Sequence, residues 1–111
     1  MDYIIAKKDT LKVKINILEI LYIGTILERP RILQFVTDYG TYEAYGKIKD
    51  FEVSLGLTFK RCHRKYLINL KRVKAINTET RQIIFDNCKV NSIKCSRRKL
   101  AKFLKNGRIY R

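Results

Sequence analysis

Short stretches in which apolar and polar residues alternate dominate the first half of the chain. Alternation with a period of two, in runs too short for a helix and rich in β-branched and aromatic residues, is typical of β-strands. Pro30 keeps Arg29 out of helical geometry, which predicts a loop at residues 28–30, and the cluster Asp38-Tyr39-Gly40 predicts a turn. The predicted strands are residues 3–6, 11–15, 20–23, 31–36 and 41–45, and the last two form a hairpin.

In two other segments the apolar residues recur at the spacing of a helix. In the first, apolar residues recur at intervals of three and four, and a glycine follows where a left-handed residue commonly ends a helix. The second begins with a serine suited to cap a helix N-terminus, and an apolar stripe runs along it. One short helix is therefore predicted between Gly46 and Gly56, and a second over residues 97–104. The supporting residues are Ile48, Phe51, Leu55 and Gly56 in the first helix, and Ser96, Leu100, Phe103, Leu104 and the Asn106-Gly107 stop in the second.

Strand alternation returns between the two predicted helices. The turn-forming segments Thr78-Glu79-Thr80 and Asp86-Asn87 separate the last three runs, which are predicted to form an antiparallel meander. Strands and helices do not alternate as in a doubly wound parallel sheet. The pattern predicts a mainly β, antiparallel fold of about ten short strands with two short helices. The runs are residues 59–62, 65–68, 73–76, 81–85 and 89–93.

The composition is that of one folded domain. The chain has 111 residues, a length that favours a single domain over residues 1–111. Its apolar fraction of 46% excludes a disordered or collagen-like chain. No apolar run is long enough to span a membrane, and the charged start is not that of a signal peptide. We therefore expect a cytoplasmic protein without a membrane partner.

The positive charge is concentrated in the second half of the chain. The net charge is +15, from 25 Lys and Arg against 10 Asp and Glu. Residues 1–55 contain eight basic and eight acidic side chains, whereas residues 56–111 contain seventeen basic ones opposed by Glu79 and Asp86. Such a concentration costs stability by self-repulsion, so a polyanionic partner explains it better than a solvated surface does.

Catalytic chemistry has few candidate groups in the basic half. This half contains one histidine and two carboxylates, no Gly-rich phosphate-binding loop and no acidic cluster for a metal ion. Cys62 and His63 are neighbours in a predicted strand, where adjacent side chains point to opposite faces and cannot act as a nucleophile and its base. We therefore expect a non-enzymatic protein without a cofactor, a metal or a small-molecule substrate.

The three cysteines are expected to be reduced. They are odd in number and lack C-x-x-C spacing, which indicates neither a disulfide framework nor a zinc site. Cys88 and Cys95 lie in or beside alternating stretches and are expected to be small buried apolar residues. Cys62 lies between Arg61 and His63, which would lower the pKa of its thiol, so a redox role for Cys62 is a hypothesis.

Three basic clusters are the stronger chemical signal. They surround His63, follow at residues 71–74 and crowd the second predicted helix. Lys and Arg bind phosphates without regard to sequence, whereas an arginine at a base edge distinguishes guanine by two hydrogen bonds. The helix start at Ser96 also offers free N–H groups to a phosphate. A basic RNA-binding or ribosome-associated module is the alternative, although the RNA-recognition and KH sequence motifs are absent.

Four blocks of the sequence occur in a characteristic order and spacing. They are Ile20 to Ile23, Tyr42 to Gly46 with the helix that follows, Phe59 to Leu70, and Cys95 to Arg98. Together they resemble the LytTR family of DNA-binding domains, which response regulators of bacterial two-component systems use as output domains for transcription regulation. The resemblance covers nearly the whole chain.

The resemblance implies a fold, a partner and a biological role. The fold would be an elongated arrangement of three small β-sheets whose loops enter successive major grooves of tandem promoter repeats and bend the duplex. The partner would be double-stranded DNA, with a second copy of the chain on the adjoining repeat. The family usually joins this domain to a receiver, and none is present here, so we expect an excised output domain or a stand-alone regulator.

The resemblance and the basic clusters assign roles to individual residues. Arg64 and Arg97 match positions that contact bases in the family. Arg29 or Arg31 would supply the third base contact, because Pro30 cannot hydrogen-bond a base. Phosphate contacts are expected from Arg61, Lys65, Lys71, Lys74, Ser96, Arg98, Lys99 and Lys102. Structural roles are expected for Phe59, Tyr66 and Ile68 in the core, for His63 at a strand edge and for Asn69 in a turn.

Overall fold

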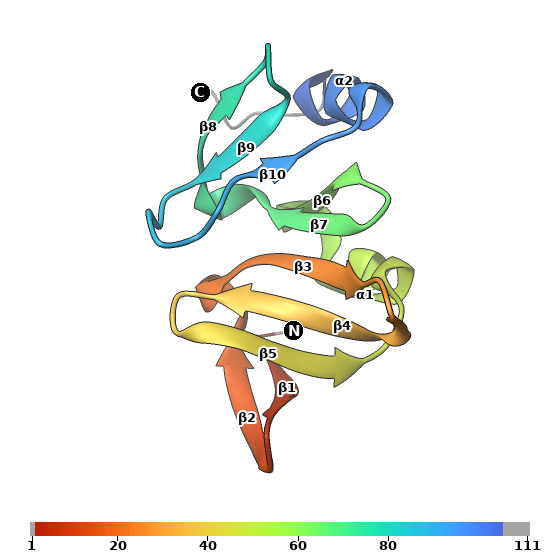
Figure 1. The fold of residues 1–111 in the computed structure, drawn as a ribbon, viewed down its shortest axis with the longest axis vertical. Helices are drawn as coiled ribbons and strands as arrows, with labels where there is room; N and C mark the ends of the chain where they lie inside the picture. The colour runs from red at the N-terminus through yellow and green to blue at the C-terminus, as the bar shows by residue number, and fades with distance from the viewer. Residues whose placement is uncertain (1, 106–111) are drawn as a thin grey trace.

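Two antiparallel sheets and two α-helices make up the computed structural model, which describes residues 2–105 (Figure 1). The molecule is elongated, with extents of 41 × 24 × 24 Å. The strands are β1 (Tyr3–Lys8), β2 (Leu11–Asn16), β3 (Ile20–Ile26), β4 (Arg29–Thr37), β5 (Gly40–Tyr45), β6 (Phe59–His63), β7 (Tyr66–Asn69), β8 (Val73–Asn77), β9 (Gln82–Phe85) and β10 (Ile93–Lys94). The α-helices are α1 (Ile48–Leu55) and α2 (Arg97–Lys105), and short 3₁₀ helices are η1 (Ile17–Glu19), η2 (Gly56–Thr58) and η3 (Leu70–Arg72).

The larger sheet has seven strands in the order β2-β1-β5-β4-β3-β7-β6, and the smaller has three in the order β10-β9-β8. A single residue pair, Lys7 with Glu43, connects the β1–β2 hairpin to β5. The hairpin therefore projects from one end of the molecule (Figure 1). The family resemblance implied three small sheets, and the structure has two because this one pair joins the hairpin to the larger sheet.

Two hydrophobic cores lie on opposite faces of the middle of the larger sheet. One core packs α1 and the hairpin against this sheet, and the other packs the smaller sheet and α2 against it. Strand β7 places Leu67 in the first core and Ile68 in the second. Likewise, β6 places Phe59 in the first core and Cys62 in the second. Successive side chains of a strand point to opposite faces, so continuous apolar runs such as Tyr66–Ile68 mark strands that are covered on both sides.

Both predicted helices are confirmed. Helix α1 contains the three predicted apolar residues and ends before Gly56 as predicted, and Gly56 has φ of 72°, a conformation that glycine adopts readily. Helix α2 begins at the predicted residue, and Ser96 caps it by accepting a hydrogen bond from the backbone N–H of Lys99 at 3.2 Å. The predicted stop at Asn106-Gly107 lies outside the described residues.

The predicted strand at residues 89–93 is wrong in most of its length. Strand β10 contains only Ile93 and Lys94, and Cys88, expected to be buried, is exposed. The side-chain oxygen of Asn87 accepts a hydrogen bond from the N–H of Lys89 at 3.0 Å. The backbone carbonyl of Asn87 accepts a second one from the N–H of Val90 at 3.1 Å. These local bonds hold the segment in a turn and replace the ladder bonds that a strand would need.

The predicted loop at residues 28–30 is also displaced. The turn lies at Leu27 and Glu28, and β4 begins at Arg29, so Pro30 lies inside a strand. The pairing of β4 with β3 jumps here, from Thr25 opposite Leu33 to Ile26 opposite Arg29. Proline lacks the N–H that a regular ladder requires, and an irregular pairing tolerates it.

Candidate nucleic-acid interface

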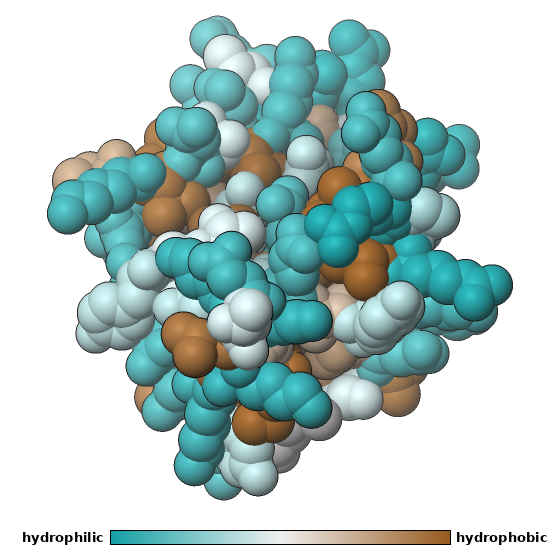
Figure 2. Space-filling model, turned by 60° about the horizontal axis from the view of Figure 1, so that its bottom comes forward, coloured by the Kyte–Doolittle hydropathy of each residue, from teal (hydrophilic) through white to brown (hydrophobic). Residues whose placement is uncertain are grey.

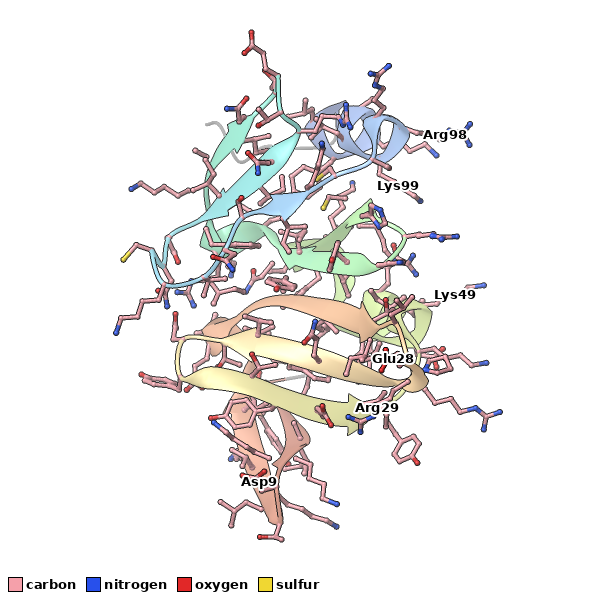
Figure 3. The ribbon with its side chains drawn as sticks, viewed as in Figure 1. Asp9, Glu28, Arg29, Lys49, Arg98 and Lys99 are labelled. Carbon is pink, nitrogen blue, oxygen red and sulfur yellow. The ribbon has the colours of Figure 1, made fainter. Side chains whose placement is uncertain are left out.

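Three connecting segments meet one edge of the molecule. Strands β3, β6 and β10 all run toward this edge, and the chain turns or leaves the sheet there (Figure 1). We call it the loop edge and define it as residues 27–31, 64–65 and 96–99. Figure 3 places Glu28 and Lys49 on this side of the larger sheet and Arg98 and Lys99 on the same side of α2. The loop edge thus combines segments from both halves of the chain.

The β6–β7 turn presents Arg64 on a firmly held backbone. Arg61 donates from Nη1 to the carbonyl of Arg64 at 2.9 Å, and His63 Nδ1 accepts from the N–H of Lys65 at 3.1 Å. The Nε of Arg61 is buried without a hydrogen-bond partner, 3.5 Å from the carboxylate of Glu52. Arg61 was expected to contact phosphate, but the structure uses it inside the protein, whereas the side chain of Arg64 is exposed to solvent.

His63 is partly buried beside this turn. Its ring packs against Tyr66 with centroids 5.5 Å apart. Burial lowers the pKa of His63, and the positive charges of Lys65 and Arg64 lower it further. The imidazole is therefore neutral at neutral pH, which agrees with its role as acceptor in the turn.

The start of α2 is attached to the β6 strand. The N–H of Ser96 donates to the carbonyl of Cys62 at 3.1 Å, and the hydroxyl of Ser96 is engaged in the helix cap. Leu100 and Phe103 anchor the helix in the second core. Arg97 and Arg98 are exposed. The helix start therefore holds two arginines close to the turn that presents Arg64.

The two arginines that flank Pro30 differ in their surroundings. Arg29 Nη1 forms an ion pair with Glu43 at 3.0 Å. Arg31 is exposed, and within residues 2–105 no ion pair or hydrogen bond engages its side chain. Arg31 is therefore freer than Arg29 to contact a base.

The expected phosphate contacts divide between two places. Lys99 and Lys102 belong to α2, and Lys65 belongs to the β6–β7 turn, so these three lie at or near the loop edge. Lys71 and Lys74 follow the far end of β7, in η3 and β8, and are not brought together with the others.

The five residues expected to have structural roles lie close together around β6 and β7. Phe59 and Ile68 are buried, and Tyr66 is half-buried against the second core. Asn69 is buried, with its amide donating to the carbonyl of Ile20 at 2.8 Å and its side-chain oxygen accepting from the N–H of Lys71 at 3.1 Å. Asn69 thus links the β7–η3 turn to the start of β3.

Residues 11–107 match the family model described as the LytTr DNA-binding domain. The chain belongs to the LytTR family of DNA-binding domains. A solved structure from Bacillus cereus, described as the LytTr DNA-binding domain of a methyl-accepting/DNA response regulator, is similar with a TM-score of 0.82 over 95% of each chain. The two sequences are 18% identical, so this likeness concerns the fold. No curated protein matches the chain.

An ion-pair cluster joins the two sheets of this LytTR domain at the end opposite the loop edge. The guanidinium of Arg72 binds Asp38 of the β4–β5 turn at 2.7 Å and Asp86 after β9 at 2.8 Å. It also donates to the carbonyl of Leu18 at 2.9 Å, and Asn87 donates to Asp38 at 3.0 Å. Hydrogen bonds from Arg72 and Asn87 outweigh burial and lower the pKa of Asp38. No sequence pattern indicated this cluster, because its members are far apart in the chain.

The cysteines of the LytTR domain are free, as expected. The expectation that Cys62 has a lowered thiol pKa is wrong. Cys62 is fully buried in the second core, and a hydrogen bond with Cys95 together with burial raises the pKa of its thiol. Cys95 is buried as expected. A buried, protonated thiol is a poor nucleophile, so the redox hypothesis loses its chemical basis.

Residues 2–105 contain neither a cluster of metal ligands nor a membrane-spanning helix. This part of the chain contains no group of three or more His, Cys, Asp or Glu side chains placed to hold a metal ion. Neither helix described there is long and apolar enough to cross a membrane. The absence of a cofactor and a cytoplasmic location remain predictions.

Proposed function

We propose that this LytTR domain binds specific sequences of double-stranded DNA through arginines on the loop edge. The observation that supports the proposal is the alignment of arginine-bearing segments from both sheets along one side of an elongated molecule. The long axis of 41 Å exceeds one turn of B-DNA, which is about 34 Å, so one domain is long enough to meet more than one groove. The proposed base contacts are Arg31, Arg64 and Arg97, with Arg29 in a lesser role.

The chemistry of these residues suits sequence recognition. An arginine can donate two hydrogen bonds to the O6 and N7 atoms of guanine in the major groove. Arg64 projects from the β6–β7 turn, Arg31 lies near the start of β4 beside the β3–β4 turn, and Arg97 lies at the start of α2. Lys65, Arg98, Lys99 and Lys102 would bind phosphates on either side and set the register. At the helix start capped by Ser96, the backbone N–H groups of Arg97 and Arg98 would add phosphate contacts, because the N–H of Ser96 itself is bound to Cys62.

We further propose that the domain is a non-catalytic output module of a transcription regulator in the cytoplasm. The similar Bacillus cereus structure is described as part of a response regulator, which supports this role by analogy. Promoter sites for such a module would be tandem repeats, each occupied by one copy. A shift from one to two bound copies on a duplex with two repeats would test this arrangement.

The decisive experiment selects bound duplexes from a random pool and then compares variants at a stated salt concentration. Arg64→Ala and Arg97→Ala should each lose about 1–3 kcal/mol of binding free energy on the selected duplex and less on a scrambled one. Lys102→Ala is the control, because loss of a phosphate contact should weaken both duplexes alike. Equal losses on both duplexes for all three variants would contradict the assigned base contacts.

RNA binding is the competing outcome. An A-form hairpin RNA that competes at least as well as the selected duplex would favour the RNA-binding alternative. We expect the RNA to compete only as a non-specific polyanion, with an affinity that falls steeply as salt is raised.

A further inference from the structure

The β1–β2 hairpin has an outward face that the core does not use. Residues opposite each other in an antiparallel pair lie on the same face of the sheet. The inward face contains Ile4, Ala6 and Ile15, which are buried in the first core. The outward face, called here the hairpin face, consists of Tyr3, Ile5, Lys7, Lys12, Lys14 and Asn16, all of which are exposed.

The hairpin face is basic in an arrangement that costs stability. Lys7 lies directly opposite Lys12, and Lys14 follows two residues later on the same face. Like charges in directly opposed positions destabilise a strand pair. Glu43 lies opposite Lys7 on β5, but within residues 2–105 no ion pair engages Lys7, Lys12 or Lys14. An unfavourable arrangement that lacks internal neutralisation is explained by an external polyanion.

A contact with an aromatic ring holds the charge of Lys14 at the surface. The Nζ atom of Lys14 lies 4.4 Å from the ring centroid of Tyr3, within the range of a cation–π interaction. Figure 2 brings this end of the molecule forward and shows hydrophilic side chains over much of it, with apolar groups between them. The surface therefore offers cations on a short, supported hairpin and does not form a continuous apolar patch.

The hairpin lies beside the first base-contacting segment. A hollow of about 550 Å³ lies between the hairpin and Arg29, which belongs to the loop edge, and both cations and carboxylates line it: Lys7, Lys8, Asp9, Arg29, Thr41 and Glu43. The hairpin also projects beyond the other strands of the larger sheet at one end of the long axis (Figure 1). A duplex that follows the loop edge along this axis would pass the hairpin after it leaves the proposed base contacts.

We infer that the hairpin face binds the phosphate backbone of duplex DNA that flanks the recognised sequence. The inference rests on the proposed function, because it adds a contact to the same duplex. Three ammonium groups on one flat face would each pair with a phosphate oxygen, and binding would release condensed counterions without base selectivity. The family match begins at residue 11, so β1 with its Lys7 lies outside the matched region.

The test compares lysine variants on duplexes of different length. Lys12→Gln and Lys14→Gln, singly and together, remove charge from the hairpin face while keeping polar side chains of similar length. Lys89→Gln is the matched control, because it removes one exposed cation from the β9–β10 loop. The selected site is prepared with minimal flanks and with an extension of about ten base pairs, one helical turn, added to either side.

For the wild-type chain, extension on one side should tighten binding and steepen the dependence of log K on log salt. Each phosphate contact contributes about 0.9 to this slope, so the double variant should lose about 1.8. When salt is raised from about 50 to about 200 mM, the binding constant of the double variant should therefore fall by a factor about 12 times smaller than that of the wild type. On the short duplex all variants should match the wild type. Lys89→Gln should retain the gain from extension.

Thermal unfolding separates a lost contact from a damaged fold. Lys12→Gln removes the charge repulsion between residue 12 and Lys7, so the melting temperature of this variant should equal or exceed that of the wild type. Failure of the extension to tighten wild-type binding, or its full retention by the double variant, would overturn the inference. Failure of the proposed function looks different, because the wild-type chain would then bind selected and scrambled duplexes equally.

Discussion

Replacing Arg72 by leucine is expected to lower the free energy of unfolding by about 3 kcal/mol. The guanidinium donates to Asp38 over 2.7 and 2.9 Å, to Asp86 over 2.9 and 3.1 Å and to the carbonyl of Leu18 over 2.9 Å. Its side chain is only 17% exposed, so it is poorly solvated apart from these bonds. Removing one partner of a fully buried ion pair costs about 3–5 kcal/mol. The expected loss lies at the low end, because Asp38 is 28% and Asp86 42% exposed and both can bind water in the variant.

Urea unfolding at equilibrium and neutral pH measures this loss. Arg29→Leu is the control, because it breaks an ion pair with Glu43 whose partners are 51% and 41% exposed and should cost less than about 1 kcal/mol. A double-mutant cycle between Arg72→Leu and Asp38→Ala should show a coupling above about 0.5 kcal/mol. Equal losses for Arg72→Leu and Arg29→Leu would refute the reasoning, since burial and bond number would then not matter.

The remaining predictions concern acid stability and a buried amide. Because hydrogen bonds from Arg72 lower the pKa of Asp38, its carboxylate stabilises the fold fully above about pH 4, and this contribution disappears as the pH falls through the lowered pKa. The stability difference between wild type and Asp38→Asn should therefore shrink below about pH 4 in urea titrations, and a constant difference would contradict the assignment. Asn69→Ala should cost about 2–3 kcal/mol, since it leaves a buried carbonyl unpaired, whereas the exposed cap Asn16→Ala should cost about 1 kcal/mol or less in the same assay. Similar losses for both asparagines would show that burial does not set the cost.

The elements of the fold were predictable where local chemistry decides them. Helix α1 followed from apolar spacing and from Gly56, and α2 followed from the capping residue Ser96. The segment after Asn87 was not predictable from alternation, because that side chain captures the backbone in a turn. The start of β4 was misplaced because a proline at an irregular pairing does not end a strand.

The candidate site was predictable in kind but not in detail. The sequence identified the basic turn and helix start that the structure brings to one edge. It did not show that Arg61 is used internally or that Lys71 lies away from the loop edge, because both depend on which ends of strands meet. Counting charge by halves also concealed the hairpin face, since acidic residues elsewhere in the first half balance Lys7 and Lys12 in the sum.

The strands shared by both cores determine how the domain comes apart. Strand β3 contributes Ile23 to one core and Leu21 to the other, and β7 does the same with Leu67 and Ile68. A break in either strand would open both cores together, so neither half of the chain forms an autonomous folding unit. The DNA contacts proposed at the two ends would therefore depend on the same cooperative unfolding equilibrium, and DNA bound at one end would protect the whole domain against global opening.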